Sequence, residues 1–392
     1  MQRITSGIQQ FLRYLFSSGV LLITVTVISL LLANSSWGVS YLEIFEKHFG
    51  FENSVIHLNE TIRHWINDGL MAIFFLLVGL EIKRELLVGE LSTRSKSLLP
   101  FIAAIGGMLI PALIYNCFNA GTNTSHGWGV PMATDIAFAL AILAMVGNKV
   151  PIGLKIFLTA LAIIDDLGAI LVIAFFYTSD LNFNYLLIAL VPVAILFFLN
   201  KTRNQYLLFY SITGIVLWYC VLKSGVHATI AGIVLAFFIP LDISKKEKNG
   251  YKVSPLERLE NSLHGVVNIV ILPLFALANT ALVIEGNILS KLTAGLSLGV
   301  MFGLFIGKPI GITFFSWLAV KTKIAALPTS VNWRHIFGAG VLGGIGFTMS
   351  IFISMLAFKH PEQQDLSKIA ILIASFFSGV IGFVLIKRIN VE

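Results

Sequence analysis

Residues 152–177 read IGLKIFLTALAIIDDLGAILVIAFFY, an apolar run interrupted near its middle by Asp165 and Asp166. A helix needs about 20 apolar residues to cross the hydrocarbon core of a bilayer, so this run is long enough to span a membrane. The two acids follow Lys155 by 10 and 11 residues, which places them about 15–17 Å along the helix. The stretch therefore predicts a transmembrane helix with two acidic side chains close to mid-bilayer.

The composition of the whole chain agrees with this segment. The 392 residues are 57% hydrophobic and 12% charged, about half the charged share of soluble domains. This excludes both a water-soluble globular fold and a disordered chain. The net charge is +7. Membrane proteins concentrate Lys and Arg in their cytoplasmic loops, so we infer no nucleic-acid partner from this charge. Cys117 and Cys220 form neither a metal-ligand nor a disulfide pattern.

Apolar runs predict an all-α polytopic membrane protein with about twelve transmembrane helices, forming one integral-membrane domain over residues 1–392. The first run is too long for the core of a signal peptide and is expected to be a retained span. The predicted spans are 15–33, 66–88, 98–118, 130–147, 152–177, 184–200, 205–222, 225–240, 265–283, 293–320, 335–358 and 366–387.

The positions of Lys and Arg predict the orientation of these spans. With the N-terminus inside, cytoplasmic segments hold 20 of the 27 basic residues and outside segments hold six. This asymmetry predicts that both termini are cytoplasmic. The longest gaps between spans, 34–65 and 241–264, are too short for a soluble catalytic domain. The function is therefore expected inside the membrane.

Charged residues in the middle of apolar spans are the strongest functional signal. They are Asp135, Asp165, Asp166 and Lys308. Each costs roughly 2.5–3.5 kcal/mol at the centre of a span, so we expect a buried carboxylate–Lys308 pair. Buried ion pairs that only fix helix register are the structural alternative. A buried carboxylate can hold either a proton or a cation, and Na⁺ would take oxygen ligands from Thr134, Asp135 and Asp166.

Two predicted spans contain interruptions. Thr134 and Asp135 follow Gly127-Trp-Gly-Val-Pro131 and predict the N-cap of a half-helix that begins in mid-membrane. In the eleventh span, Gly343, Gly344 and Gly346 precede Phe347; close helix packing through small residues is the alternative interpretation there. Spans 3–5 and 10–12 run in opposite senses, each triplet with its interrupted member in the middle. This pattern is typical of inverted-repeat transporters.

Two other functions use intramembrane acids. An intramembrane aspartyl protease would need a Gly-x-Gly-Asp segment, whereas Asp165 follows Leu-Ala-Ile-Ile, and it would leave Lys308 unexplained. A passive cation channel would be poorly served by a buried Lys facing the cation path. The sequence therefore favours a secondary transporter over an enzyme or a channel.

Six segments in order along the chain closely resemble the NhaA family of bacterial Na⁺/H⁺ antiporters. They are NDGLMAIFFLLVGLEIKRE (67–85), PMATDIAF (131–138), AIIDDLG (162–168), SGVHAT (224–229), GKP (307–309) and GGIGFTMSIF (343–352). The resemblance implies a twelve-helix fold whose broken fourth and eleventh helices cross at mid-membrane. It implies electrogenic export of Na⁺ or Li⁺ for more than one H⁺ by alternating access, with activation at alkaline pH and no cofactor. Family members are inner-membrane proteins and tend to be homodimers in the bilayer.

The resemblance also implies roles for particular residues. Asp166 would be the principal Na⁺/H⁺ ligand, supported by Asp135 and Thr134, and Asp165 would pair with Lys308 and take part in proton exchange. Asp135 would offset the positive half-helix ends and Lys308 the negative ones. The residues matching the family's pH-responsive positions are Glu81, Arg84, Glu85, His227, Glu260 and His264. Asn261 stands where family members commonly have His, so the resemblance does not fix the pH set point of this chain.

Overall fold

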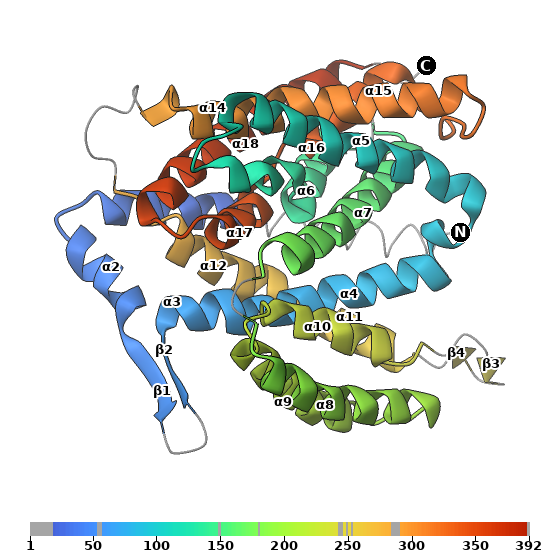
Figure 1. Cartoon of the computed structure of the whole chain (residues 1–392). Helices are drawn as coiled ribbons and strands as arrows, with labels where there is room; N and C mark the ends of the chain where they lie inside the picture. The colour runs from blue at the N-terminus through green and yellow to red at the C-terminus, as the bar shows by residue number, and fades with distance from the viewer. Residues whose placement is uncertain are drawn as a thin grey trace. The chain divides into compact units, whose positions relative to one another are not determined.

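Helices make up most of the chain in the computed structural model, as the apolar runs predict (Figure 1). The structure describes residues 19–52, 57–147, 150–178, 181–241, 246–247, 250–251, 254–283 and 291–389. Each predicted span overlaps a helical segment of the described residues, although residues 15–18 of the first span lie outside them, and the prediction of a polytopic α-helical membrane protein is confirmed.

Eight helices among the described residues are long and apolar enough to cross a membrane: Ile62–Leu87, Ser97–Asn119, Ser125–Val146, Ile152–Phe176, Phe183–Lys201, Pro255–Asn279, Gly295–Lys321 and Pro361–Arg388. Two bent pairs raise the number to ten: Gly19–Ala33 with Gly38–Glu46, and Trp333–Gly343 with Phe347–Ala357. Leu207–Lys223 and Thr229–Phe238 are apolar but shorter. Eight to ten spans are thus supported by length, and the total of twelve stays a prediction.

The described residues form two compact units, and the chain passes between them several times. Unit 1 lies within residues 1–30, 90–172 and 282–392, and unit 2 within 31–89 and 173–281. Unit 1 contains η2 (Glu90–Ser92), α5 (Arg94–Asn119), η3 (Ser125–Met132), α6 (Ile136–Val146), most of α7 (Ile152–Phe176), α14 (Gly295–Phe302), η6 (Gly303–Gly307), α15 (Lys308–Lys321), α16 (Trp333–Gly343), α17 (Phe347–Ala357) and α18 (Pro361–Arg388).

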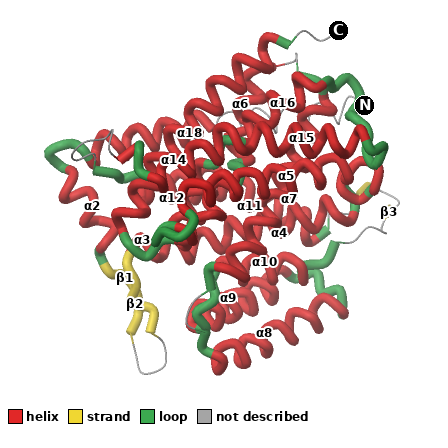
Figure 2. The backbone as a smooth tube through the Cα atoms, turned by 45° about the horizontal axis from the view of Figure 1, so that its top comes forward, coloured by secondary structure: helices red, strands yellow, loops and turns green. Residues whose placement is uncertain are grey.

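Unit 2 contains the remaining elements. They are α2 (Gly38–Glu46), β1 (His48–Glu52), β2 (His57–Thr61), α3 (Ile62–His64), η1 (Trp65–Leu70), α4 (Met71–Leu87), α8 (Phe183–Lys201), α9 (Leu207–Lys223), α10 (Thr229–Phe238), β3 (Lys246–Glu247), β4 (Gly250–Tyr251), α11 (Pro255–Val266), η5 (Val267–Ile271) and α12 (Leu272–Asn279). The antiparallel pair β1–β2 occupies part of the predicted gap 34–65 and is a strand element that the helical pattern did not predict (Figure 2).

Glycines allow α5 and α15 to lie side by side in unit 1 (Figure 1). A Cβ atom on Gly311 would collide with the carbonyl group of Gly106, and one on Gly107 would lie 2.9 Å from Ile312 Cγ1. Close backbone approach through small residues is a common way for membrane helices to associate. This contact holds Lys308, the first residue of α15, beside α5.

The ninth predicted span starts too late. The sequence pattern placed it at 265–283, whereas α11 begins at Pro255. Ser254 is the N-cap, its hydroxyl accepting from Glu257 N at 3.2 Å while the Glu257 carboxylate accepts from Ser254 N at 2.9 Å. This capping box is visible in the sequence, but the amphipathic first turns hide it from a search for apolar runs.

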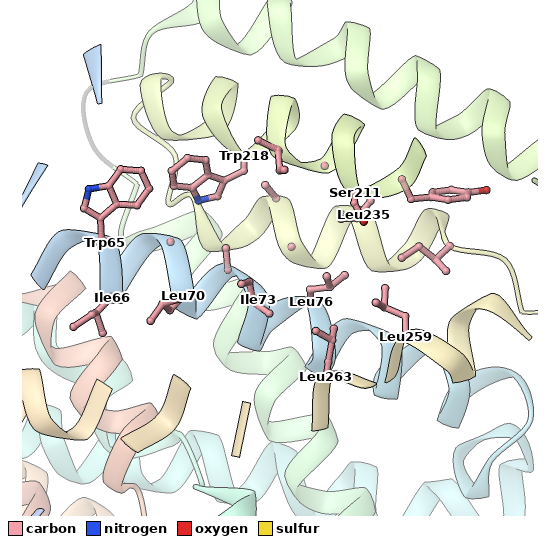
Figure 3. Close-up of a pocket in the computed structure, with 18 of the residues that line it drawn as sticks. Trp65, Ile66, Leu70, Ile73, Leu76, Ser211, Trp218, Leu235, Leu259 and Leu263 are labelled. Carbon is pink, nitrogen blue, oxygen red and sulfur yellow. The ribbon is translucent and has the colours of Figure 1, made fainter. Parts of the chain in front are cut away.

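An apolar cavity of about 740 Å³ lies within unit 2, between α4, α9, α10 and α11 (Figure 3). Trp65 and Trp218 stack at one end of it, with ring centroids 5.9 Å apart, and Leu259 and Leu263 lie at the other. The lining is almost entirely apolar and includes no acidic side chain among the described residues, so cation ligands are expected elsewhere.

Candidate cation-binding site

The first helix interruption lies at Ala133–Asp135 in unit 1. The 3₁₀ helix η3 ends at Met132, the backbone is extended at Ala133 and Asp135, and α6 begins at Ile136. The Asp135 carboxylate accepts a hydrogen bond from Phe138 N at 3.0 Å and is therefore the N-cap of α6. The half-helix that the sequence predicted after Thr134-Asp135 is present in the structure.

The second interruption separates α16 from α17, which meet at an angle of 47°. Gly344, Ile345 and Gly346 form the break. The φ angles of Gly344 and Gly346 are −71° and −90°, which any residue can adopt, so limited space explains these glycines. A Cβ atom on Gly344 would lie 2.7 Å from Ser378 Oγ, and one on Gly346 would lie 2.9 Å from Ser350 Cβ.

The two breaks contact each other directly. Asp135 N donates to the carbonyl of Ile345 at 2.7 Å, and Thr348 donates to Asp135 Oδ2 through both its backbone N, at 3.1 Å, and its hydroxyl. Asp135 therefore closes the N-terminal turns of α6 and α17 together. Sequence reasoning placed Asp135 correctly but missed Thr348, although its position two residues after Gly346 at the start of a half-helix was a usable signal.

Thr134 connects this junction to α7. Its hydroxyl oxygen lies 2.7 Å from Asp165 Oδ2 and 2.9 Å from the carbonyl oxygen of Gly343. The ammonium of Lys308 donates to the same Asp165 Oδ2. The expected pair of a carboxylate with Lys308 is thus formed by Asp165, and both side chains are fully buried.

Asp166 lies beside this pair. It is 1% exposed, and its carboxylate interacts electrostatically with Lys308. The junction therefore contains Asp165 and Asp166 beside the Lys308 ammonium, and Thr134, which contacts both Asp165 and the Gly343 carbonyl, connects them to Asp135 and Thr348 at the two breaks. Hard cations prefer such oxygen ligands. The assignment of Na⁺ to Asp166, Asp135 and Thr134 stays a prediction. In this structure the Asp135 carboxylate accepts hydrogen bonds from α6 and α17.

The predicted pH-responsive residues form a second cluster, within unit 2, on α4 and α11. Arg84 lies 3.1 Å from Glu85 and 3.0 Å from Glu260. His264 Nε2 lies 3.3 Å from Glu81 Oε1 and 3.7 Å from Glu260 Oε1. Five of the six predicted residues are thus brought together, and Asn261, the departure from the family pattern, is exposed on the same helix.

His227 is the sixth residue and has different partners. It lies just before α10, and its Nε2 donates to the carbonyl of Tyr177 at 2.9 Å. Its ring also interacts electrostatically with Asp68. The structure therefore does not join His227 to the Glu81–His264 cluster through the contacts of the described residues.

Comparison with known proteins shows which family this chain belongs to. Residues 9–386 match the family described as Na⁺/H⁺ antiporter 1. The chain belongs to this antiporter family. It is 50% identical over 387 residues to Na(+)/H(+) antiporter NhaA 1 of Flavobacterium johnsoniae, covering 99% of this chain and 98% of that protein. It is 50% identical over 383 residues to NhaA of Aliivibrio fischeri, covering 97% of each chain.

A third relative is similar to this chain over almost the same length. Na(+)/H(+) antiporter NhaA 1 of Clostridium beijerinckii is 48% identical over 391 residues, covering 99% of this chain and 96% of that protein. The resemblance inferred from six sequence segments is therefore confirmed along nearly the whole chain. Membership of the antiporter family also agrees with the multi-pass helical structure, in which the buried charges of unit 1 surround two touching helix breaks.

Proposed function

We propose that this protein is a secondary transporter that exports Na⁺ or Li⁺ in exchange for protons, with no catalytic chemistry and no cofactor. One observation carries the proposal: the buried Asp165–Lys308 pair, with buried Asp166 beside it, lies next to the contact between the breaks of η3–α6 and α16–α17. The relatives named Na(+)/H(+) antiporter support the choice of ions.

Charge balance explains how the two ions would be coupled. With Asp166 protonated and Asp165 paired to Lys308, this group of three is neutral. A Na⁺ held by two ionised aspartates beside a deprotonated Lys308 leaves the group at −1. Two protons, one from Asp166 and one from Lys308, then leave for each Na⁺ that enters. Binding of one ion excludes the other because both need the same carboxylates.

This accounting makes the cycle electrogenic, with more than one proton per exported cation. Alternating access supplies the rest of the mechanism: the site faces one side of the membrane when loaded with Na⁺ and the other when loaded with protons. The inverted relation of spans 3–5 and 10–12 supports this mode of transport. The basic-residue asymmetry supports an inner-membrane protein with both termini in the cytoplasm.

Regulation is proposed to reside in unit 2. The Glu81, Arg84, Glu85, Glu260 and His264 cluster contains groups that change charge with pH, and we assign to it the activation at alkaline pH. His227 is a separate candidate on α10. We propose a homodimer in the bilayer, as family resemblance implies.

The test is a proton-gradient assay in everted membrane vesicles. Addition of NaCl or LiCl is expected to release protons from vesicles that contain the protein and not from empty-vector vesicles. Asp166→Asn is expected to abolish this release while the protein still inserts in the membrane. Asp365→Asn is the matched control, because the Asp365 side chain is 54% exposed, and it should keep the wild-type response.

A Na⁺ flux that persists without counter-movement of protons would support the cation channel instead. Wild-type exchange by Asp166→Asn would overturn the role of that residue. Measuring the response over a range of pH in the same vesicles gives the set point, and a membrane potential imposed with K⁺ and valinomycin tests electrogenicity, since a 1:1 exchange would not respond to it.

A further inference from the structure

The pH-responsive cluster of unit 2 also has the geometry of a metal site. Glu81, Glu260 and His264 each present one ligand atom, and these three atoms lie within 4.8 Å of one another. Two of the ligands come from a single face of α11, because Glu260 and His264 are four residues apart, and the third comes from α4.

The two distances from His264 to the carboxylates are close to those of tetrahedral coordination. Zn²⁺ binds His nitrogen and carboxylate oxygen at about 2.0–2.2 Å, so neighbouring ligand atoms of a tetrahedral site lie roughly 3.3–3.6 Å apart. His264 Nε2 lies 3.3 Å from Glu81 Oε1 and 3.7 Å from Glu260 Oε1. His264 can therefore share an ion with either carboxylate with little movement, and the two carboxylate oxygens lie no more than 4.8 Å apart.

The electrostatics of the cluster also favour a divalent cation. Glu81, Glu85 and Glu260 supply three carboxyl groups, and Arg84 supplies one guanidinium in contact with two of them. With these groups ionised and His264 neutral, the cluster carries −2, which one divalent ion balances. Within the cluster Arg84 balances one carboxylate, so the remaining negative charge, beside a Glu260 side chain that is only 7% exposed, is costly without a cation.

Exposure and ligand surroundings complete the argument. The side chains of His264 and Glu81 are 22% and 20% exposed, so these two ligands are not sealed inside the protein. Arg84 Nε lies 3.0 Å from Glu260 Oε1, so a charged group stands next to this ligand in the position that outer-sphere partners take in metal sites. The imidazole ligand favours a first-row transition ion over Na⁺ or Mg²⁺.

We propose that Glu81, Glu260 and His264 bind a divalent transition-metal ion, with Zn²⁺ the best fit, and that the bound ion joins α4 to α11. Three protein ligands leave the fourth tetrahedral position for water. This site is distinct from the Asp165–Lys308 junction, which lies in unit 1, and does not depend on the exchange function proposed above.

The experiment titrates metal into the purified full-length protein, produced with a tag that lacks histidine and freed of metal with EDTA. Co²⁺ serves as the spectroscopic probe, and its visible d–d absorption reports tetrahedral coordination. One Co²⁺ is expected to bind per chain, to be displaced by Zn²⁺, and to resist a large excess of Na⁺ or Mg²⁺. Absence of saturable Co²⁺ binding, or displacement by Na⁺, would overturn the proposal.

Variants locate the binding. Glu81→Gln and His264→Asn should each weaken Zn²⁺ binding at least about tenfold. Glu43→Gln, which removes an exposed acid of α2 outside the cluster, should bind Zn²⁺ as the wild type does. Asp166→Asn should also bind normally, because it removes only the proposed transport ligand. Unchanged affinity in Glu81→Gln and His264→Asn, or a loss in Asp166→Asn, would refute the site.

A ligand swap separates a lost site from a misfolded protein. His264→Cys replaces the imidazole by a thiolate, which also binds Zn²⁺ and Co²⁺. This variant should bind Co²⁺ and show a sulfur-to-metal charge-transfer band. The wild type, whose proposed ligands include no cysteine, should not show this band. Binding without that band would place the ion elsewhere and contradict the assignment.

Discussion

Thr348 and Asp135 join the two interrupted helices of unit 1. Asp135 Oδ2 accepts from the backbone N of Thr348 at 3.1 Å and from its hydroxyl, while Oδ1 accepts from Phe138 N at 3.0 Å. One carboxylate therefore caps α6 and α17, although Asp135 and Thr348 are 213 residues apart in sequence. Both helix starts carry partial positive charge, so one negative charge offsets two of them.

Thr348→Val removes the hydroxyl donor while keeping the shape of the side chain. A hydrogen bond to a charged acceptor contributes about 1.5–3 kcal/mol, so we expect the free energy of unfolding to fall by about that amount. Thermal unfolding in detergent measures the change. Ser354→Ala is the control, since that hydroxyl donates within its own helix to Ile351 O at 2.8 Å; equal losses in both variants would contradict the capping role.

Lys308→Met leaves Asp165 buried without its counterion. Removing one partner of a buried pair costs about 3–5 kcal/mol, so this variant should be strongly destabilised. The double variant Asp165→Asn with Lys308→Met has no unpaired charge in this pair and should recover most of that stability, but not the proton-coupled exchange. A double-mutant cycle in detergent unfolding tests this, and additive losses would show that the two side chains are not coupled.

Gly311→Ala places a methyl group against the carbonyl of Gly106, where α15 and α5 meet. Because the obstacle is backbone, the helices must separate, and we expect a loss of at least about 1–3 kcal/mol. Gly69→Ala is the control, since its nearest neighbour is a ring carbon of Trp65 at 3.3 Å. Folded yield and unfolding temperature report the difference, and a Gly311→Ala protein as stable as the control would contradict the close packing.

Lys83→Met tests a cation that the sequence assigned only to orientation. Lys83 Nζ donates to the carbonyls of Phe237, at 2.7 Å, and Ile239, at the C-terminal end of α10. Losing these bonds leaves buried carbonyls unpaired and should cost about 1–3 kcal/mol. The exposed Lys201→Met should change stability by less than about 0.5 kcal/mol. Comparable losses of stability in the two variants would show that the hydrogen bonds from Lys83 to α10 do not stabilise the protein.

Lys83 also shows where sequence reasoning reached its limit. A basic residue at the end of an apolar run predicts a loop facing the cytoplasm, yet this side chain is 9% exposed and caps a helix from another part of the chain. Nothing local marks that partner, because it lies 154 residues away. The helical segments, the half-helix after Asp135 and the break at Gly344–Gly346 were predictable because each depends on neighbouring residues.

The site was predictable in its members but not in its contacts. Charge in an apolar span is costly, so Asp135, Asp165, Asp166 and Lys308 stood out without any structure. Which carboxylate meets Lys308 depends on how α7 is rotated against α15, so the residues alone left both aspartates open, and only the family resemblance implied Asp165. The hairpin β1–β2 escaped prediction because its short strands lie between apolar helices and bury no periodic face: every residue of β1 is exposed.

The pairing of Asp165 with Lys308 has a consequence for biosynthesis. Lys308 is 143 residues further along the chain, and ribosomes add about 5–20 residues per second. Asp165 therefore leaves the ribosome roughly 7–30 seconds before its counterion exists. During that interval α7 must remain near the insertion machinery or carry Asp165 as a neutral acid. The ion pair that completes the junction can therefore form only late in the synthesis of the chain.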